Sequence, residues 1–212
     1  MRRSLLFFLI LQFSAFAVTL DRVAIVVDQD DIIKDSDIVR DLHATEFLNG
    51  EPPSATLAER KKTASHLIDQ VFIRREIRIG DYPVATTEEA NRQLEQLEKQ
   101  RFHSEAALTA DLGKYGLTLP DLREQFRWQL TVLDFIDARF KPAVLVSEDS
   151  VDQYYKAHLA QLRKDNPKAT EAQLRQAARD TLTEEQVNKL FFAWLDQHRH
   201  DAKIRFLEEK LS

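Results

Sequence analysis

Strand-like sequence at both ends of an otherwise helical chain constrains the fold more than any other feature. Residues 23–27 read VAIVV, with β-branched side chains at alternate positions, the period of two that is typical of a strand. The acidic stretch at 28–31 predicts a turn, and the pair at 32–33 predicts a short return strand. Residues 202–207 alternate in the same way at the far end of the chain.

An isolated hairpin is only marginally stable and leaves an open edge. A strand from the C-terminal end would pair with that edge and complete a small sheet. We therefore predict that residues 202–207 pair with the N-terminal hairpin. The alternative is that AKIRFLEEKL, residues 202–211, continues the preceding helix, which its Glu and Lys content permits.

The middle of the chain shows apolar residues spaced three and four apart, which is typical of one face of a helix. Only 4 Gly and 6 Pro are available for turns, which favours helices joined by short loops. With Ser and Thr as caps, the pattern predicts helices over 36–48, 55–79, 86–102, 104–112 and 118–140, one from Ser147, and two opening at Thr170 and Thr183. The expected fold class is mostly α, a helical core domain with a small β-hairpin extended by a C-terminal strand.

The N-terminus predicts export. Arg2 and Arg3 precede an apolar run, and Ala15-Phe16-Ala17 fits the small residues around a signal cleavage site. We predict a signal peptide at 1–17, cleaved after Ala17. The alternative is an uncleaved anchor, but the run is shorter than the roughly 20 residues that a membrane-spanning helix needs.

Charge and cysteine content narrow the function classes. The chain has 35 acidic and 30 basic residues, a formal charge of −5, with the two signs interspersed. No nucleic-acid partner is expected, because phosphate binding requires clustered Lys and Arg. The chain has no Cys, so its stability must come from the core, and no lipid-modified cysteine can anchor it to a membrane after cleavage.

None of the metal-binding or catalytic motifs considered for this sequence has all the residues that it requires. A calcium loop starting at Asp28 would need Gly and Glu where Ile33 and Val39 stand. His198 and His200 point about 200° apart on a helix and cannot share a metal. The sequence contains no G-x-S-x-G and no glycine-rich phosphate loop. No catalytic residue, cofactor or metal is expected, and the chain is not predicted to be an enzyme.

Five segments together resemble the SurA-type periplasmic chaperones, which are related to parvulin-type prolyl isomerases. After the signal peptide, DRVAIVVDQDDIIKDSDI (21–38) is similar to the strand, turn and helix start that open that family. LIDQVFIRREI (67–77), YGLTLPDLREQFRWQL (115–130) and VSEDSVDQYY (146–155) resemble its successive helices. TEEQVNKLFFAWLDQHRHDAKIRF (183–206) resembles its last helix and strand.

The chain departs from that family between the predicted helix that carries Tyr154 and Tyr155 and the last predicted helix. Full-length relatives carry parvulin domains there, whereas only residues 156–182 fill this gap. The resemblance implies one chaperone core domain over 18–212, with N-terminal helices at 18–160, a linker at 161–170, and C-terminal helices and a strand at 171–212.

The function that the resemblance implies is a periplasmic holdase without isomerase activity. Its partners would be unfolded exported proteins, above all outer-membrane protein precursors. Two alternatives stay open: a degenerate parvulin-family isomerase, or a helical adaptor for one folded envelope partner.

The helix predicted at 118–140 is apolar on two sides. We expect its main buried face to hold Leu122, Phe126, Leu130, Leu133 and Phe140. A second stripe consists of Trp128, Val132 and Phe135, and it is our candidate client-binding surface. The alternative is that the helix lies between two layers of the core, because buried aromatic residues are common there.

Overall fold

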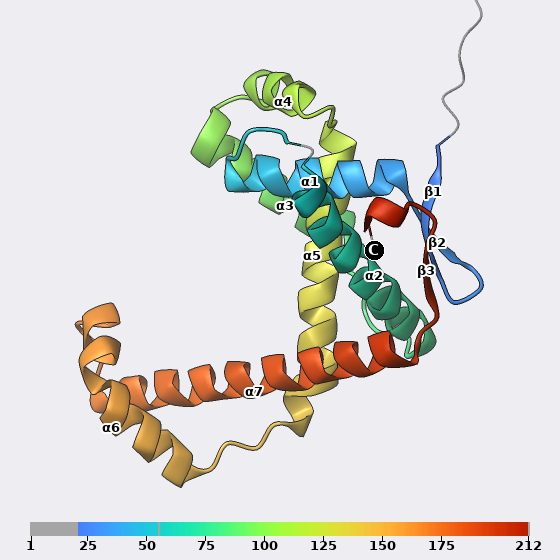
Figure 1. Cartoon of the computed structure of the whole chain (residues 1–212). Helices are drawn as coiled ribbons and strands as arrows, with labels where there is room; N and C mark the ends of the chain where they lie inside the picture. Colours follow the sequence, from blue (N-terminus) through green and yellow to red (C-terminus); the bar gives the residue numbers. More distant parts are fainter. Residues whose placement is uncertain (1–20, 55, 212) are drawn as a thin grey trace, which may run out of the picture.

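The computed structural model describes residues 21–54 and 56–211, and the predicted signal peptide at 1–17 lies outside these residues. The described chain is mostly α with one small sheet, so the predicted fold class is confirmed (Figure 1).

The two ends of the described chain meet in one antiparallel sheet. It consists of β1 (Val23–Val27), β2 (Asp31–Lys34) and β3 (Ile204–Phe206), in the order β2-β1-β3. Ile25 pairs with Phe206, and Val27 pairs with Ile204. The predicted pairing of 202–207 with the hairpin is therefore confirmed, and the helical alternative is wrong for this segment.

The charged hairpin turn is bound to the helix at Leu57–Ile79 by ion pairs and a hydrogen bond. Arg75 forms ion pairs with Asp28 and Asp31, and its Nη2 donates to the carbonyl oxygen of Val27 at 3.2 Å. A carboxylate pair on one guanidinium fixes geometry as well as charge. The turn thus has a structural partner that the sequence did not reveal.

The helices follow the predicted order. They are α1 (Asp35–Asn49), α2 (Leu57–Ile79), α3 (Thr87–Leu97), the π-helical turn η1 (Glu98–Phe102), α4 (Glu105–Lys114), α5 (Leu119–Phe140), η2 (Lys141–Ala143), α6 (Glu148–Asp165), α7 (Glu171–Asp201) and η3 (Glu209–Leu211). Capping boxes at Thr86, Thr118 and Thr170 start α3, α5 and α7, because each hydroxyl accepts a backbone N–H three residues on.

Two predicted helix starts are wrong. Helix α1 begins at Asp35, and the backbone N–H of Lys34 donates to Asp37 Oδ2 at 3.0 Å, so Ser36 lies inside the first turn rather than at the cap. Thr183 does not open a second helix, because α7 is continuous from Glu171 to Asp201.

The first half of the linker predicted at 161–170 lies in a helix. Helix α6 extends to Asp165 and α7 begins at Glu171, which leaves only the short turn at 166–170 between them. Helix α6 therefore belongs with the start of α7 in space, and not with the helices that precede it.

Three apolar clusters build the body. The sheet packs on α1 and α2 around buried residues that include Ile25, Ile38 and Phe72. Helices α2, α5 and α7 meet in an aromatic cluster, and α1, α4 and α5 enclose a third cluster around Phe47 and Leu122. Burial of such side chains is the main term that stabilises the fold.

Arginine side chains join segments that lie far apart in the sequence. Arg60 of α2 pairs with Asp35 and with Glu208 beyond β3. Arg199 of α7 donates to Asp69 Oδ1 at 2.6 Å and to the carbonyl oxygen of Ser65 at 2.7 Å. The C-terminal segment is thus held on α2 by charge-assisted hydrogen bonds as well as by the sheet.

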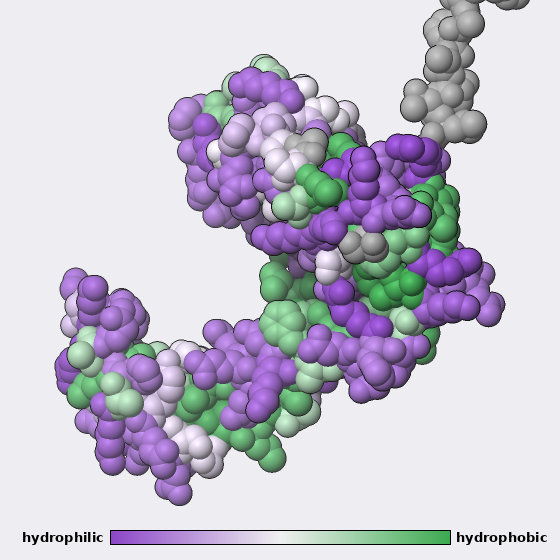
Figure 2. All heavy atoms as spheres, viewed as in Figure 1, coloured by the Kyte–Doolittle hydropathy of each residue, from purple (hydrophilic) through white to green (hydrophobic). Residues whose placement is uncertain are grey.

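Helix α5 forms a column between two projections of the molecule. Helices α1, α3 and α4 surround one end of it, and α7 crosses the other end (Figure 1). We call α6 together with the first half of α7 the arm. The space-filling view shows a hollow between the α1/α3/α4 lobe and the arm (Figure 2).

The arm has a small core of its own. Val151, Tyr155 and Leu162 of α6 pack on Leu174 and Ala178 of α7. The arm joins the body through α7 and through the segment between η2 and α6, where Leu145 is 90% exposed.

Candidate functional site

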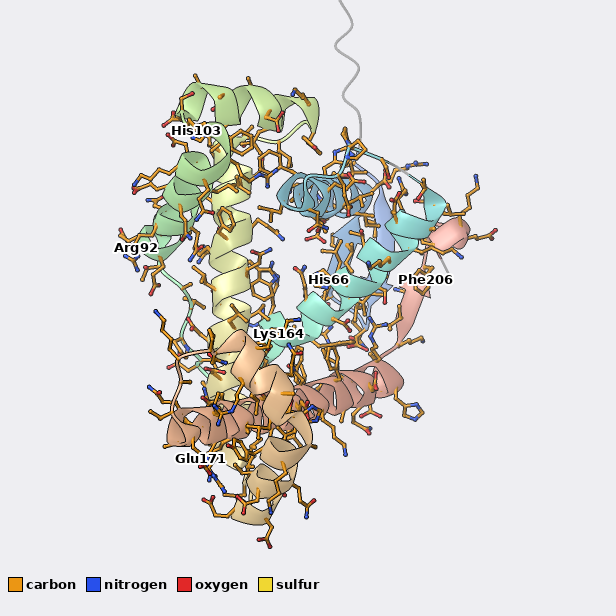
Figure 3. The ribbon with its side chains drawn as sticks, turned by 90° about the vertical axis from the view of Figure 1, so that its left-hand side faces the viewer. His66, Arg92, His103, Lys164, Glu171 and Phe206 are labelled. Carbon is orange, nitrogen blue, oxygen red and sulfur yellow. The ribbon has the colours of Figure 1, made fainter. Side chains whose placement is uncertain are left out.

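The candidate site is a groove between α1, α2 and α5, with β2 at one end. Its volume is about 450 Å³, within the roughly 300–1,000 Å³ that is usual for ligand sites. Figure 3 looks at these helices from the open side of the hollow, and His66 of α2 lies in the middle of the view. We refer to this feature as the groove.

One wall of the groove is aromatic. Trp128 of α5 lines it, and the guanidinium of Arg74 lies over the indole, 3.7 Å from the ring centroid. This is a close cation–π contact, worth about 0.5–2 kcal/mol depending on exposure. Trp128 is 9% exposed, so the groove reaches only part of its surface.

The floor of the groove is polar. Gln70 Nε2 donates to Asp41 Oδ1 at 3.4 Å, and Arg74 Nη2 donates to Gln70 Oε1 at 3.5 Å. Burial raises the pKa of Asp41, and the charges of His66 and Arg74 oppose that shift. A carboxylate, an amide and a guanidinium thus follow one another across α1 and α2.

Other charged groups around the groove neutralise one another. Arg40 of α1 pairs with Asp37 at 3.8 Å and with Asp121 of α5 at 3.7 Å. Arg75, at the β2 end, pairs with Asp28 and Asp31. The groove therefore offers donors and acceptors side by side and no single sign of charge.

Apolar side chains border this polar floor. Leu67 and Val71 of α2 and Ala44 of α1 line it, and Ile32 of β2 is 50% exposed at its end. The combination of apolar borders and a few polar groups is typical of sites that bind a ligand by shape and fix it by hydrogen bonds.

The structure places all three residues of the predicted client-binding stripe at one apolar cluster, and only Trp128 also lines the groove. Trp128 is a largely buried member of the cluster of α2, α5 and α7, and Val132 is half-buried against it. Phe135 is 0% exposed and contacts Tyr82, Phe140 and Trp194, with ring centroids 5.1–5.9 Å apart. A client could not reach Phe135 in this conformation, so Phe135 belongs to the core and not to the candidate surface.

The predicted main face of α5 also needs correction. Leu122 and Phe140 are buried as expected, but Leu133 is 61% exposed. The reason is that the first half of α5 joins a cluster with α1, α3 and α4, while α7 covers the second half on another side. The stripe that holds Phe135 is thus the buried side in the second half of the helix.

Sequence reasoning missed Asp41, Gln70 and Arg74. Gln70 and Arg74 are four residues apart, which places them on one face of α2, but such polar pairs usually face solvent. Asp41 reaches them from another helix, 29 residues away from Gln70. Only the crossing of α1 and α2 brings the three together.

Two further features of the described residues bear on function. Within 21–54 and 56–211, no group of three or more His, Cys, Asp or Glu side chains could hold a metal ion. No helix in the same part of the chain is long and apolar enough to cross a membrane.

A comparison with models of known protein families finds no match, and a comparison with curated proteins finds no similar sequence. The likeness to SurA-type chaperones therefore rests on the sequence motifs alone.

Proposed function

We propose that the protein is a periplasmic chaperone that binds unfolded segments of exported proteins, including outer-membrane protein precursors, and keeps them from aggregating. Export rests on the sequence at 1–17, and the client class rests on the likeness of motifs to SurA-type chaperones. The single structural observation that supports the proposal is the groove between α1, α2 and α5, which Trp128 lines.

The dimensions of the site suit a chain segment better than a folded partner. A folded partner would dock on a broad apolar surface of about 800 Å² per side. Here the apolar borders are narrow, and they surround polar groups that can bond a flexible segment. A client held in the groove would be shielded by the arm and by the α1/α3/α4 lobe.

The proposal includes no isomerase activity. The parvulin domain of related proteins would stand between α6 and α7, and here the five residues 166–170 make that connection. A separate domain needs at least about 50 residues. The short turn supports a chaperone that acts by binding alone.

The test is the aggregation of an unfolded outer-membrane protein, measured by light scattering with residues 18–212. We expect the wild-type protein to suppress scattering and Trp128→Ala to suppress it less, because this substitution removes the aromatic wall and frees Arg74. Leu207→Ala is the matched control, since Leu207 is 57% exposed and follows β3, away from the groove.

The same protein separates the alternatives. Acceleration of a proline-limited refolding step, which is otherwise as slow as tens of seconds, would favour an isomerase. Tight binding of one folded envelope protein, without suppression of aggregation, would favour an adaptor. Either result would overturn the proposal.

A further inference from the structure

The floor of the groove holds two polar groups with unused bonding capacity. Asp41 accepts one long hydrogen bond from Gln70, and Arg74 donates one long hydrogen bond to the same amide. Within 21–54 and 56–211, no ion pair closer than 4.0 Å involves either of them. A guanidinium has five N–H donors and a carboxylate has about four acceptor sites, so most of both remain free.

Both groups are held in place although, among the described residues, neither forms a short hydrogen bond or an ion pair within 4.0 Å. Gln70, which joins them, is 5% exposed and cannot swing into solvent. The indole of Trp128 covers one face of the Arg74 guanidinium at 3.7 Å. The N–H donors lie in the plane of the guanidinium, so this stacking fixes the plane and leaves its edge available for bonding.

We infer that Asp41 and Arg74 bind the main chain of an extended polypeptide segment, with Arg74 donating to a carbonyl oxygen and Asp41 accepting from an amide N–H. The inference rests on the proposed function and specifies which part of the client is recognised. Every residue of an extended chain except proline offers one donor and one acceptor. A fixed donor and a fixed acceptor, set on neighbouring helices, match that pattern whatever the side chains are.

The surroundings fit an extended chain. Side chains alternate to the two sides of such a backbone. The apolar Leu67 and Val71 of α2 and the indole of Trp128 on α5 line the groove together with these polar groups. Recognition of the main chain would fix the segment, and these borders would accept a range of apolar side chains.

The test compares two end-blocked peptides of alternating valine and serine. In the second peptide, esters replace alternate amides, which removes N–H donors and keeps the side chains. We expect residues 18–212 to bind the ester peptide about tenfold more weakly, as follows from the loss of a hydrogen bond to a charged acceptor. Fluorescence anisotropy of the labelled peptides gives both affinities.

Variants assign the effect to the groove. Asp41→Leu should weaken binding of the amide peptide about tenfold and leave binding of the ester peptide nearly unchanged, because the N–H that Asp41 accepts is already missing there. Asp41→Asn keeps an acceptor oxygen, so its affinity for the amide peptide should lie between those of the wild type and Asp41→Leu. Asp134→Leu is the control, since Asp134 is exposed on α5 outside the groove lining.

The outcomes separate this inference from the proposed function. If the protein suppresses aggregation but binds the amide and ester peptides equally, main-chain recognition is overturned and the chaperone proposal stands. If it neither suppresses aggregation nor binds either peptide, both fall. Should Asp41→Leu fail to fold by circular dichroism, the comparison of the two peptides on the wild-type protein still decides the question.

Discussion

Asp28 and Lys203 form two hydrogen bonds with each other, although 175 positions separate them in the sequence. The backbone N–H of Asp28 donates to the carbonyl oxygen of Lys203 at 2.8 Å, and the backbone N–H of Lys203 donates to Asp28 Oδ1 at 2.8 Å. These two hydrogen bonds lie where β1 ends and β3 begins. It ties the last helix of the chain to the first hairpin.

Deleting residues 202–212 should therefore destabilise the whole body. The deletion removes the half-buried Ile204 and Phe206 and the buried Leu211, and it exposes the edge of β1. We expect a loss of roughly 3–6 kcal/mol from apolar burial, out of a total stability of roughly 5–15 kcal/mol. Thermal unfolding by circular dichroism should shift down by roughly 10 °C or more.

Leu207→Ala is the control for the truncation, because Leu207 is largely exposed and should change the melting temperature little. If the truncated protein melts at the temperature of the full chain, closure of the sheet by β3 does not hold the body together.

The acid stability of the protein should depend on Asp28. The hydrogen bond from Arg75 and the backbone N–H of Lys203 lower the pKa of the Asp28 carboxyl. A lowered pKa in the folded state means that the contribution of this carboxylate is fully present above about pH 4, the ordinary value for aspartate. The contribution is lost as the pH falls below that value, because protonation then breaks the bond to Arg75.

The measurement is urea unfolding of the wild type and of Asp28→Asn at neutral pH and below pH 4. Asparagine keeps an oxygen that can accept from Lys203 but cannot titrate. The stability difference between the two proteins should be largest at neutral pH and should shrink as the solution is acidified. A difference that is constant with pH would show that Asp28 contributes through packing alone.

The sequence predicted the sheet and most helix starts because their signals are local. Alternation of side chains identifies a strand, and a Ser or Thr hydroxyl that accepts a backbone N–H identifies a cap. The same signal misled at Thr183, whose Oγ1 instead donates to the carbonyl oxygen of Arg179 at 2.9 Å inside α7. A capping residue can lie within a helix when its hydroxyl bonds the preceding turn.

The buried side of α5 could not be predicted from its sequence. The helix is apolar on two sides, and only the crossing of α7 over its second half decides that Phe135 is enclosed and Leu133 is open. The groove floor depends in the same way on where α1 and α2 cross. Sequence patterns define which residues share a face, but the packing of helices decides which face is covered.

The two aromatic residues predicted as one surface should behave differently when they are truncated. Phe135→Ala should cost about 3–5 kcal/mol in unfolding free energy, because Phe135 is fully buried among other rings. Trp128→Ala should also lower the unfolding free energy, because Trp128 belongs to the same buried cluster. Only Trp128 lines the groove, so its truncation should in addition lower the affinity for clients. Leu133→Ala is the control and should stay within about 0.5 kcal/mol of wild type. An unchanged client affinity for a folded Trp128→Ala would mean that Trp128 acts only as part of the core.

A cavity in the core of the arm should make local unfolding of the arm more frequent without unfolding the body. Its core is separate from the other apolar clusters, and between the two the chain passes through the polar part of α7 around Thr183. Leu174 is 0% exposed in the arm core, so Leu174→Ala should leave a cavity there. We expect hydrogen exchange to become faster in α6 and in the first half of α7, while β1 and α2 keep their protection.

Glu184→Ala is the matched control, since Glu184 is exposed on α7 and should leave the exchange of both parts unchanged. If Leu174→Ala also speeds exchange in β1, the arm and the body unfold as one cooperative unit. In that case the hollow is bounded by a rigid frame. A selective effect would instead mean that the arm can move against the α1/α3/α4 lobe while the groove stays intact, so that a client could enter without disturbing the fold.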